Sequence, residues 1–384
     1  MWRFYFYFMK ISGALLVVLL NFSSCNGPET KKLSMEKVGF VKIPISGNTS
    51  SRSSRTHLVS LDSGEYLARH SRISQSIQLY HLDEERLAYE LFLAKDGPNP
   101  INFYYGFSFI SPDSIYISSV PPEIIMVNHT GEVKSRFKVN SPDLKLTSLS
   151  AFNGTPLIKH ENILYGAQPL FMGHHTIDVS EFKDHYHIFK YHILADTIEW
   201  LPIHFREEHW SRGKKMDNFS YLIKGDSIIV SPHHDHDLWI YRLNSGELID
   251  YKETKSAYVK DFLYLNSMPT GHMEGPELVL SHPQYENFLY DRFRNIYYRF
   301  YYLPYHFSKG EALMDLQNDR PLIGIMVLND QLEIIGEYHF DKFEIEAGNY
   351  FVGKHGLYLS NNNLNHADFS DDFLNYSIVR FNYE

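Results

Sequence analysis

The chain has 384 residues and a formal net charge of −10 at pH 7, from 36 Lys and Arg against 46 Asp and Glu. This acidic balance argues against a nucleic-acid partner, because binding a phosphate backbone requires clustered Lys and Arg. A single cysteine excludes intramolecular disulfides, so packing alone must hold the fold together. Aromatic residues make up 15% of the chain, which favours strands, because aromatic side chains suit pleated, half-buried surfaces.

The first 24 residues have the pattern of an export signal. Arg3 and Lys10 make the start positive, and residues 11–22 form an apolar run shorter than the roughly 20 residues that a spanning helix needs. Cleavage before Cys25 would leave the cysteine as the first residue, as in bacterial lipoproteins, which this segment resembles. We predict that residues 1–24 are a lipoprotein signal peptide and that Cys25 is the lipidation site.

Lipidation also accounts for the lone cysteine, because an exported protein with an unpaired thiol is unusual. It predicts a protein of the bacterial cell envelope, held at the outer membrane by acyl chains such as palmitate and facing either the periplasm or the outside. The alternative is a plain secretory signal, because Phe22 stands where lipoprotein signals usually carry Leu. Residues 25–35 combine Gly, Pro and charge without apolar periodicity, which predicts a tether to a single domain over residues 36–384.

A turn followed by a short apolar strand recurs six times along the rest of the chain. The intervals between successive copies are 50, 48, 65, 68 and 61 residues. Recurrence at comparable spacing indicates a repeat architecture, in which a unit buries its apolar faces only against its neighbours. The copies are SGEYLA at Ser63, DSIYIS at Asp113, ENILYG at Glu161, DSIIVS at Asp226, RNIYYR at Arg294 and HGLYLS at His355.

The segments after these copies predict two further strands joined by a tight turn. After DSIYIS, for example, EIIMV precedes a turn around residues 129–131 and the segment EVKSRFKV. The first segment is continuously apolar, as expected for a strand covered on both faces. The second alternates, as expected for a strand with one solvent face. Each unit is therefore predicted to be a four-stranded antiparallel meander.

Such units form a β-propeller when they are arranged radially. The last unit is one strand short, since only NYSIVRFNYE follows HGLYLS, whereas residues 37–45 offer a spare strand near the start. We predict an all-β fold: a six-bladed β-propeller of four-stranded antiparallel blades, closed when the N-terminal strand pairs as the outer strand of the last blade. The alternatives are a seventh blade hidden in residues 252–285 and a pair of β-sandwiches.

Three features together match a known family. They are the signal with Cys25, the run GEYLARHSRISQSIQLYHLD from Gly64, and the connector KDGPNPI at residues 95–101, which leads into FYYGFSF. With these features the chain resembles the uncharacterised six-bladed β-propeller lipoproteins of Gram-negative bacteria, a domain-of-unknown-function family. The resemblance covers nearly the whole chain after the signal. It implies the fold and an envelope location, and it implies no activity.

The segment SPHHDHD, residues 231–237, lies between the predicted second and third strands of the fourth unit. Neutral imidazole and carboxylate groups are ligands for Zn²⁺ or a similar divalent ion. The alternative is a solvated loop, because a preorganised site usually takes a ligand from elsewhere in the fold and the chain contains 21 histidines. No other cofactor is expected. The candidate metal ligands are His233, His234, Asp235, His236 and Asp237.

A second candidate site lies in LARHSR, where Arg69, His70 and Arg72 follow the second strand of the first unit. On one face near the ring axis, these side chains would bind an anion such as a carboxylate or a sugar acid. The alternative is that they pair with the surplus of acidic residues. Glu274 and Glu277 resemble the carboxylate pair of a glycosidase, but acidic residues in a linker are usually just solvated.

The sequence contains no nucleophile elbow, phosphate loop or dinucleotide-binding fingerprint, so no catalytic residue is predicted. We therefore expect a lipid-anchored, non-enzymatic binding or scaffold protein that takes a protein or small-molecule ligand at one face of the ring. The alternative is a metal-assisted hydrolase or lyase with its site in the central channel. Four or more converging His, Asp, Glu or Asn side chains at the starts of the innermost strands of different blades would favour the enzyme.

Overall fold

In the computed structural model of the chain, the described residues are 33–383 without 54, 98, 102–103, 140–148, 169–184, 266–273 and 309. Residues Lys31–Glu384 form one compact unit, separate from Met1–Thr30. The predicted signal peptide, Cys25 and most of the predicted tether lie outside the described residues. None of the helices in the described part of the chain reaches the length and apolarity that a bilayer crossing requires.

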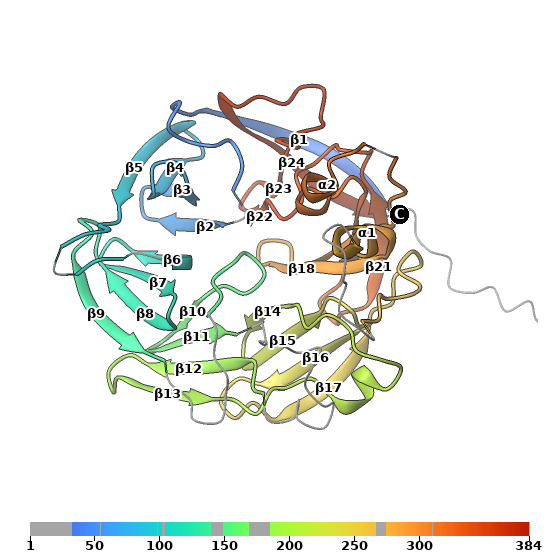
Figure 1. The fold of residues 1–384 in the computed structure, drawn as a ribbon, viewed down its shortest axis with the longest axis horizontal. Helices are drawn as coiled ribbons and strands as arrows, with labels where there is room; N and C mark the ends of the chain where they lie inside the picture. The colour runs from blue at the N-terminus through green and yellow to red at the C-terminus, as the bar shows by residue number, and fades with distance from the viewer. Residues whose placement is uncertain are drawn as a thin grey trace, which may run out of the picture. The chain divides into compact units, whose positions relative to one another are not determined.

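Six four-stranded antiparallel sheets are arranged in a ring, which confirms the predicted six-bladed β-propeller (Figure 1). The first strand of each blade lies innermost and the last lies at the rim. The first three blades contain β2 Thr56–Leu61, β3 Gly64–Ser71, β4 Ser76–His81 and β5 Arg86–Phe92; then β6 Tyr104–Ser111, β7 Ser114–Ser119, β8 Glu123–Val127 and β9 Val133–Lys138; then β10 Ile158–His160, β11 Ile163–Ala167, β12 Ile188–His192 and β13 Thr197–Trp200. The last three contain β14 Phe219–Lys224, β15 Ser227–Pro232, β16 Asp237–Arg242 and β17 Leu248–Glu253; then β18 Gln284–Asp291, β19 Ile296–Tyr302, β20 Ile323–Leu328 and β21 Ile334–His339; then β22 Tyr350–Gly353, β23 Gly356–Ser360, β24 Phe373–Tyr383 and β1 Leu33–Pro44.

The six copies of the sequence repeat occupy equivalent places in the blades. Each copy forms the turn after the innermost strand and the start of the second strand, so that the copies lead into β3, β7, β11, β15, β19 and β23. The second strands, like the third, are mostly buried, because they have a strand on each side and a neighbouring blade over each face. This location explains why an apolar run follows the turn in every copy.

Strand β1 closes the ring by pairing antiparallel with β24 as the outer strand of the last blade. The register runs from Leu33↔Tyr383 to Pro44↔Phe373, with a bulge between Lys37 and Gly39. The pairing confirms the predicted closure, although the strand begins four residues before the predicted Lys37. Along β1, Val41 and Ile43 are buried while Phe40 and Lys42 are exposed, so one face of the strand packs inward.

The hydrophobic core consists of six clusters, one at each junction between neighbouring blades. The cluster between the last and first blades, for example, contains Ile43 and Tyr376 from one side and Leu67 and Tyr80 from the other. A single sheet offers two apolar faces and covers neither of them itself. The ring solves this problem at all six junctions, which is how the fold is held without a disulfide.

The proposed seventh blade within residues 252–285 is absent from the described residues, so this alternative was wrong. Strand β17 ends at Glu253 and β18 begins at Gln284. Between them lies the helix α1, Glu274–Ser281, which packs against α2, Leu313–Asn318, in a small apolar cluster. Pro276 lies near the start of α1, where a proline costs no helical hydrogen bond.

Candidate functional site

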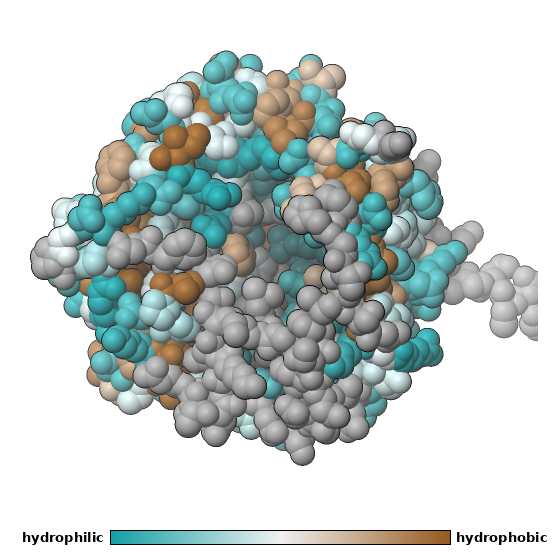
Figure 2. Space-filling model, in the orientation of Figure 1, coloured by the Kyte–Doolittle hydropathy of each residue, from teal (hydrophilic) through white to brown (hydrophobic). Residues whose placement is uncertain are grey.

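A cavity of about 240 Å³ lies where four blades meet at one end of the ring. Its wall comes from the loop that leads into β10, from the starts of β14 and β18, from the connection between β15 and β16, and from Gly348 just before β22. The loop into β10 reaches the middle of the ring, and the space-filling view shows a hollow there with hydrophilic residues around much of it (Figures 1 and 2). We call this the channel cavity; it is lined by Phe152, Asn153, Gly154, Thr155, Asn218, Phe219, His233, Glu286, Asn287 and Gly348.

Asn153 fixes the loop over the ring centre. Its side-chain oxygen accepts the Thr56 backbone N–H at 2.8 Å. Its amide nitrogen donates to Thr56 Oγ1 at 2.9 Å and to the Gly348 carbonyl at 2.8 Å. Thr56 begins β2 in the first blade and Gly348 precedes β22 in the last, so one side chain from the third blade's entry loop joins three blades. All of its hydrogen-bonding groups are used, which makes Asn153 a structural clamp.

Gly154 lets the same loop approach both the fourth and the fifth blades closely. The Tyr221 N–H donates to the Gly154 carbonyl at 2.9 Å, which docks the loop on β14. A Cβ atom on Gly154 would lie 2.4 Å from Asn287 Oδ1, which is too close for a non-bonded contact. Glycine at this position therefore leaves room for the Asn287 amide in the channel cavity.

A β-bulge in β18 turns two polar side chains toward the cavity. Tyr285 pairs with Tyr301 and Phe288 pairs with Arg299, so Glu286 and Asn287 together oppose a single residue of β19. A bulge of this kind re-aims side chains that would otherwise point to opposite faces, and bulges are frequent next to functional sites. As a result, both neighbouring residues line the channel cavity.

Several polar groups of the cavity have no hydrogen-bond partner in the protein. The Asn287 side chain is 4% exposed, and neither it nor the Asn218 side chain makes a hydrogen bond to any described residue. The His233 Nε2 atom is also buried without a partner. An unpartnered buried amide costs free energy, so such groups are rare in folded proteins unless water or a ligand satisfies them. The site therefore has spare donors and acceptors for a bound molecule.

Glu286 and His233 are the titratable groups of the cavity wall. The Glu286 carboxylate lies 3.7 Å from His233 Nδ1, and its side chain is 19% exposed, as expected for a group at the bottom of a cavity. Burial raises the pKa of Glu286 to about 7, and the nearby positive charge of Arg320 offsets part of this rise. Burial, with the charge of Arg299, lowers the pKa of His233 to about 3, so the imidazole is neutral near pH 7.

The segment 231–237 is a buried connection between β15 and β16, which contradicts the expectation of a solvated loop. Arg299, which is fully buried, holds it: the guanidinium donates to the backbone carbonyls of Pro232, Asp235 and His236 and to Ser231 Oγ. The same guanidinium donates to both oxygens of Thr254 and lies 3.5 Å from the ring centre of Tyr285. The loop is buried because a residue from the next blade satisfies its carbonyl groups.

The five candidate metal ligands point to different partners. His233 lies beside Glu286, while His236 Nδ1 lies 2.9 Å from the Tyr285 hydroxyl. Asp235 lies 3.2 Å from His209 Nδ1, and Asp237 accepts from Arg206 at 3.2 Å. His234 is also buried, with Nδ1 unpartnered. No group of three or more His, Cys, Asp or Glu side chains with metal-binding geometry occurs among the described residues.

The predicted anion-binding residues lie at the same end of the ring but are not brought together. Arg69 and His70 are neighbours on β3, so their side chains point to opposite faces of the sheet, and Arg72 is exposed. Arg69 donates to the Ser50 carbonyl at 2.7 Å, and His70 lies 3.3 Å from Arg55. Burial, together with these arginines, lowers the pKa of His70 to about 3.

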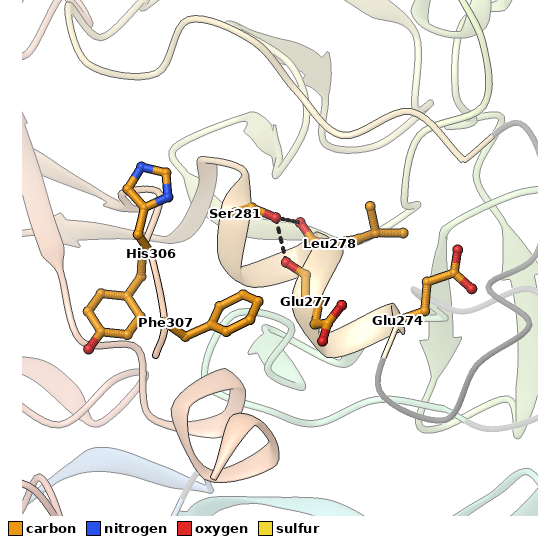
Figure 3. A pocket seen from close by; sticks show the side chains of 7 residues that line it. Glu274, Glu277, Leu278, Ser281, His306 and Phe307 are labelled. Carbon is orange, nitrogen blue, oxygen red and sulfur yellow. Dashed lines mark hydrogen bonds between the residues drawn. The ribbon is translucent and has the colours of Figure 1, made fainter. Parts of the chain in front are cut away.

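A second cavity, of about 340 Å³, lies between α1 and residues 305–307 (Figure 3). Glu274 and Glu277 stand on α1, and His306 and Phe307 lie across from the helix. Both carboxylates and His306 are exposed to solvent. Exposed polar side chains must lose more of their hydrating water when a ligand binds, and this desolvation weakens binding. The channel cavity is therefore the stronger candidate site.

Eight residues were predicted from the sequence to bind an anion or a metal ion. Of these, only His233 is among the described residues that line the channel cavity. Asn218, Glu286 and Asn287 were missed as individual residues. The starts of the innermost strands were named as the place where polar side chains of a site would converge, and Asn218 and Glu286 lie there. Five described residues of the kinds that would favour an enzyme line the cavity, but His233 follows β15, a second strand, and Asn153 is the clamp. The other three lie at the starts of innermost strands of only two blades, so the condition of four or more from different blades is not met. Three of the five are amides, which cannot transfer protons.

The fold and the cavity define the protein as a six-bladed β-propeller with a half-open cavity, lined by polar and aromatic side chains, at one end of the ring. The chain belongs to the family described as a domain of unknown function (DUF4221), whose model matches residues 37–338. This confirms the resemblance to such a family. None of the curated proteins matches the chain.

Two crystal structures share the fold. A DUF4221 family member from Bacteroides vulgatus is 20% identical, with a TM-score of 0.81 over 93% of this chain and 100% of that one. A protein from Bacteroides fragilis, described as exported, is 10% identical, with a TM-score of 0.55 over 91% of this chain and 95% of that one. At these identities the likeness concerns the fold alone.

Proposed function

We propose that this protein is a lipid-anchored binding propeller of the bacterial envelope that holds a small polar ligand in the channel cavity. The observation that carries the proposal is Asn287, a residue that is 4% exposed, is aimed into the cavity by a bulge and makes no side-chain hydrogen bond among the described residues. The hydrogen-bonding groups of such a side chain are satisfied only when water or a ligand occupies the cavity. The propeller supplies a rigid frame, because the clamp Asn153 joins three blades at the rim of the site.

An enzyme acting in the same cavity is the second candidate. The observation in its favour is Glu286, whose raised pKa of about 7 suits a general acid or base, beside the neutral His233. Binding takes precedence because the remaining polar wall is made of amides. The two differ in turnover: a Glu286→Gln variant of a binding protein still binds its ligand, whereas the same variant of an enzyme binds substrate without converting it.

We expect Asn287→Leu to abolish ligand binding without destabilising the protein. Leucine has a similar volume, and the Asn287 side chain makes no hydrogen bond among the described residues, so its replacement should change the free energy of unfolding by less than about 1 kcal/mol. The measurement is thermal unfolding with and without probes from a metabolite panel of neutral sugars, uronic acids, amino sugars, amino acids and nucleosides. At least one probe should raise the unfolding midpoint of the wild type and leave that of the variant unchanged.

The matched control is Asn349→Leu, which replaces another buried amide at the next blade. Asn349 bonds to Thr56, Tyr376 and Glu346, so its loss should lower the free energy of unfolding by about 3 kcal/mol. If Asn287→Leu destabilises the protein as much as Asn349→Leu does, Asn287 is a structural residue. Protection by no probe at millimolar concentration would also count against the proposed function.

For the anchor, we expect Cys25→Ser to move the protein from the membrane fraction to the soluble fraction and to abolish labelling by an alkyne analogue of palmitate. The reason is that serine cannot form the thioether through which a lipoprotein signal is processed. Ser24→Ala keeps the cysteine and a small residue before the cleavage point, and it should leave both readouts unchanged. Unaltered membrane association of the serine variant would refute lipid anchoring at this position.

A further inference from the structure

We propose that the channel cavity takes one neutral, polyhydroxylated ring, that is, a ligand of the sugar class. This inference rests on the proposed function and specifies its ligand. It is carried by the kinds of groups that line the cavity and by the charges that the lining lacks.

The unpartnered groups of the cavity call for a ligand whose polar groups both donate and accept. The Asn218 and Asn287 amides each present a carbonyl acceptor beside an NH₂ donor, and a neutral histidine offers one of each. A hydroxyl is the small group that donates and accepts at a single atom, so adjacent hydroxyls match the two ends of an amide. Several such pairs within one cavity correspond to several hydroxyls on one ligand.

The charges of the lining argue against an ionic ligand. Among the described residues that line the channel cavity there is no Lys or Arg, and Glu286 is the one acid. An anion would therefore be desolvated beside a carboxyl group without a cation to compensate for the lost hydration. A cation would require Glu286 in its charged form, which burial at the bottom of the cavity disfavours.

The shape and apolar part of the cavity agree with this class. A volume of about 240 Å³ corresponds to roughly eight water molecules, which is room for one sugar-sized ring rather than a chain of several. Phe152 and Phe219 supply apolar wall on the β10 loop and at the start of β14. A pyranose combines hydroxyls around its edge with C–H groups on its faces, so it needs both kinds of wall.

The test compares matched ligands on the purified full-length chain after the signal. Isothermal titration or ligand-observed NMR is run with methyl glucoside, methyl galactoside and methyl mannoside as neutral probes, and with glucuronic acid and glucosamine as charged ones. We expect at least one neutral glycoside to bind at least tenfold more tightly than either charged sugar. Asn287→Leu should weaken that binding about tenfold or more, because it removes two hydrogen bonds.

Two variants locate the ligand and the role of Glu286. Glu286→Gln keeps a donor and an acceptor at the same place, so it should weaken binding of a neutral sugar less than Asn287→Leu does and keep the preference for neutral over charged sugars. Loss of binding in that variant would mean that the negative charge is required and that the ligand is a cation. Glu277→Gln, on the wall of the α1 cavity, should have no effect, and a loss there would place the ligand in the second cavity.

The outcomes separate this inference from the proposed function. If amino acids or nucleosides protect the wild type but not Asn287→Leu, and no neutral sugar does, then the cavity is a binding site and the sugar assignment is wrong. If glucuronic acid is preferred, the charge argument is wrong. If no probe of any class binds, both the inference and the proposed function fail.

Discussion

Replacing Arg299 by Met should lower the free energy of unfolding by about 4 kcal/mol. Arg299 is fully buried on β19 and donates hydrogen bonds from all three of its nitrogen atoms to the loop of the preceding blade and to Thr254. Methionine has a similar length but cannot donate. The loop carbonyls would then be left buried and unsatisfied, at about 1–3 kcal/mol for each group that water cannot reach.

The measurement is equilibrium unfolding in urea, with Arg292→Met as the matched control. Arg292 is exposed on the turn before β19 and bonds only to the Ser60 hydroxyl, so its loss should stay within about 0.5 kcal/mol. Arg299→Lys should fall between the two, because an ammonium group keeps the charge without the planar fork that reaches several acceptors. A loss of less than about 1 kcal/mol for Arg299→Met would contradict the role assigned to this residue.

Introducing a charge on the inner face of the closing strand should open the ring. Ile43 is fully buried in the folded chain. It pairs with Leu374 and belongs to the hydrophobic cluster that joins the last blade to the first. We expect Ile43→Asp to destabilise the protein by about 4 kcal/mol or more, because the carboxylate must be either buried without a partner or released together with the strand. Ile43→Ala should cost about 2–5 kcal/mol through the cavity that it leaves.

Phe40→Asp tests whether position on the strand matters. Phe40 lies on the same strand, pairs with Ser377 and is 54% exposed, so an aspartate there faces water. Both variants are compared by thermal unfolding and by limited proteolysis of the N-terminal segment. If both variants unfold at the same temperature and are cleaved at the same rate, the buried face of β1 does not hold the strand in the last blade.

The repeat was readable from the sequence because it combines two physical constraints at a fixed offset. Turn residues such as Asp226 end the innermost strand, and the second strand that follows is covered on both faces, so it must be apolar. The pairing of β1 with β24 followed from counting strands. The helices α1 and α2 were not predicted, because each is short and lies in a connection without a long apolar period.

The site was less readable, and the reasons are local. His233 stood out because it lies in a run of histidines and aspartates, whereas Glu286 and Asn287 are single polar residues within the strand QYENFLYD. Their joint orientation depends on a bulge that shifts the pairing with β19, and a shift of register leaves no mark in composition. Arg299 was not singled out in RNIYYRFYY, because its acceptors come from a different blade.

The pairing of Leu33 with Tyr383 also fixes the order of events during biogenesis. The N-terminal strand finds its partner only at the other end of the described chain, so the last blade cannot be completed until the C-terminal segment is available for pairing. Contacts this distant in sequence slow folding. The incomplete ring meanwhile leaves the unpaired edge of β1 accessible, and a cell that makes this protein must protect that edge until the two ends meet.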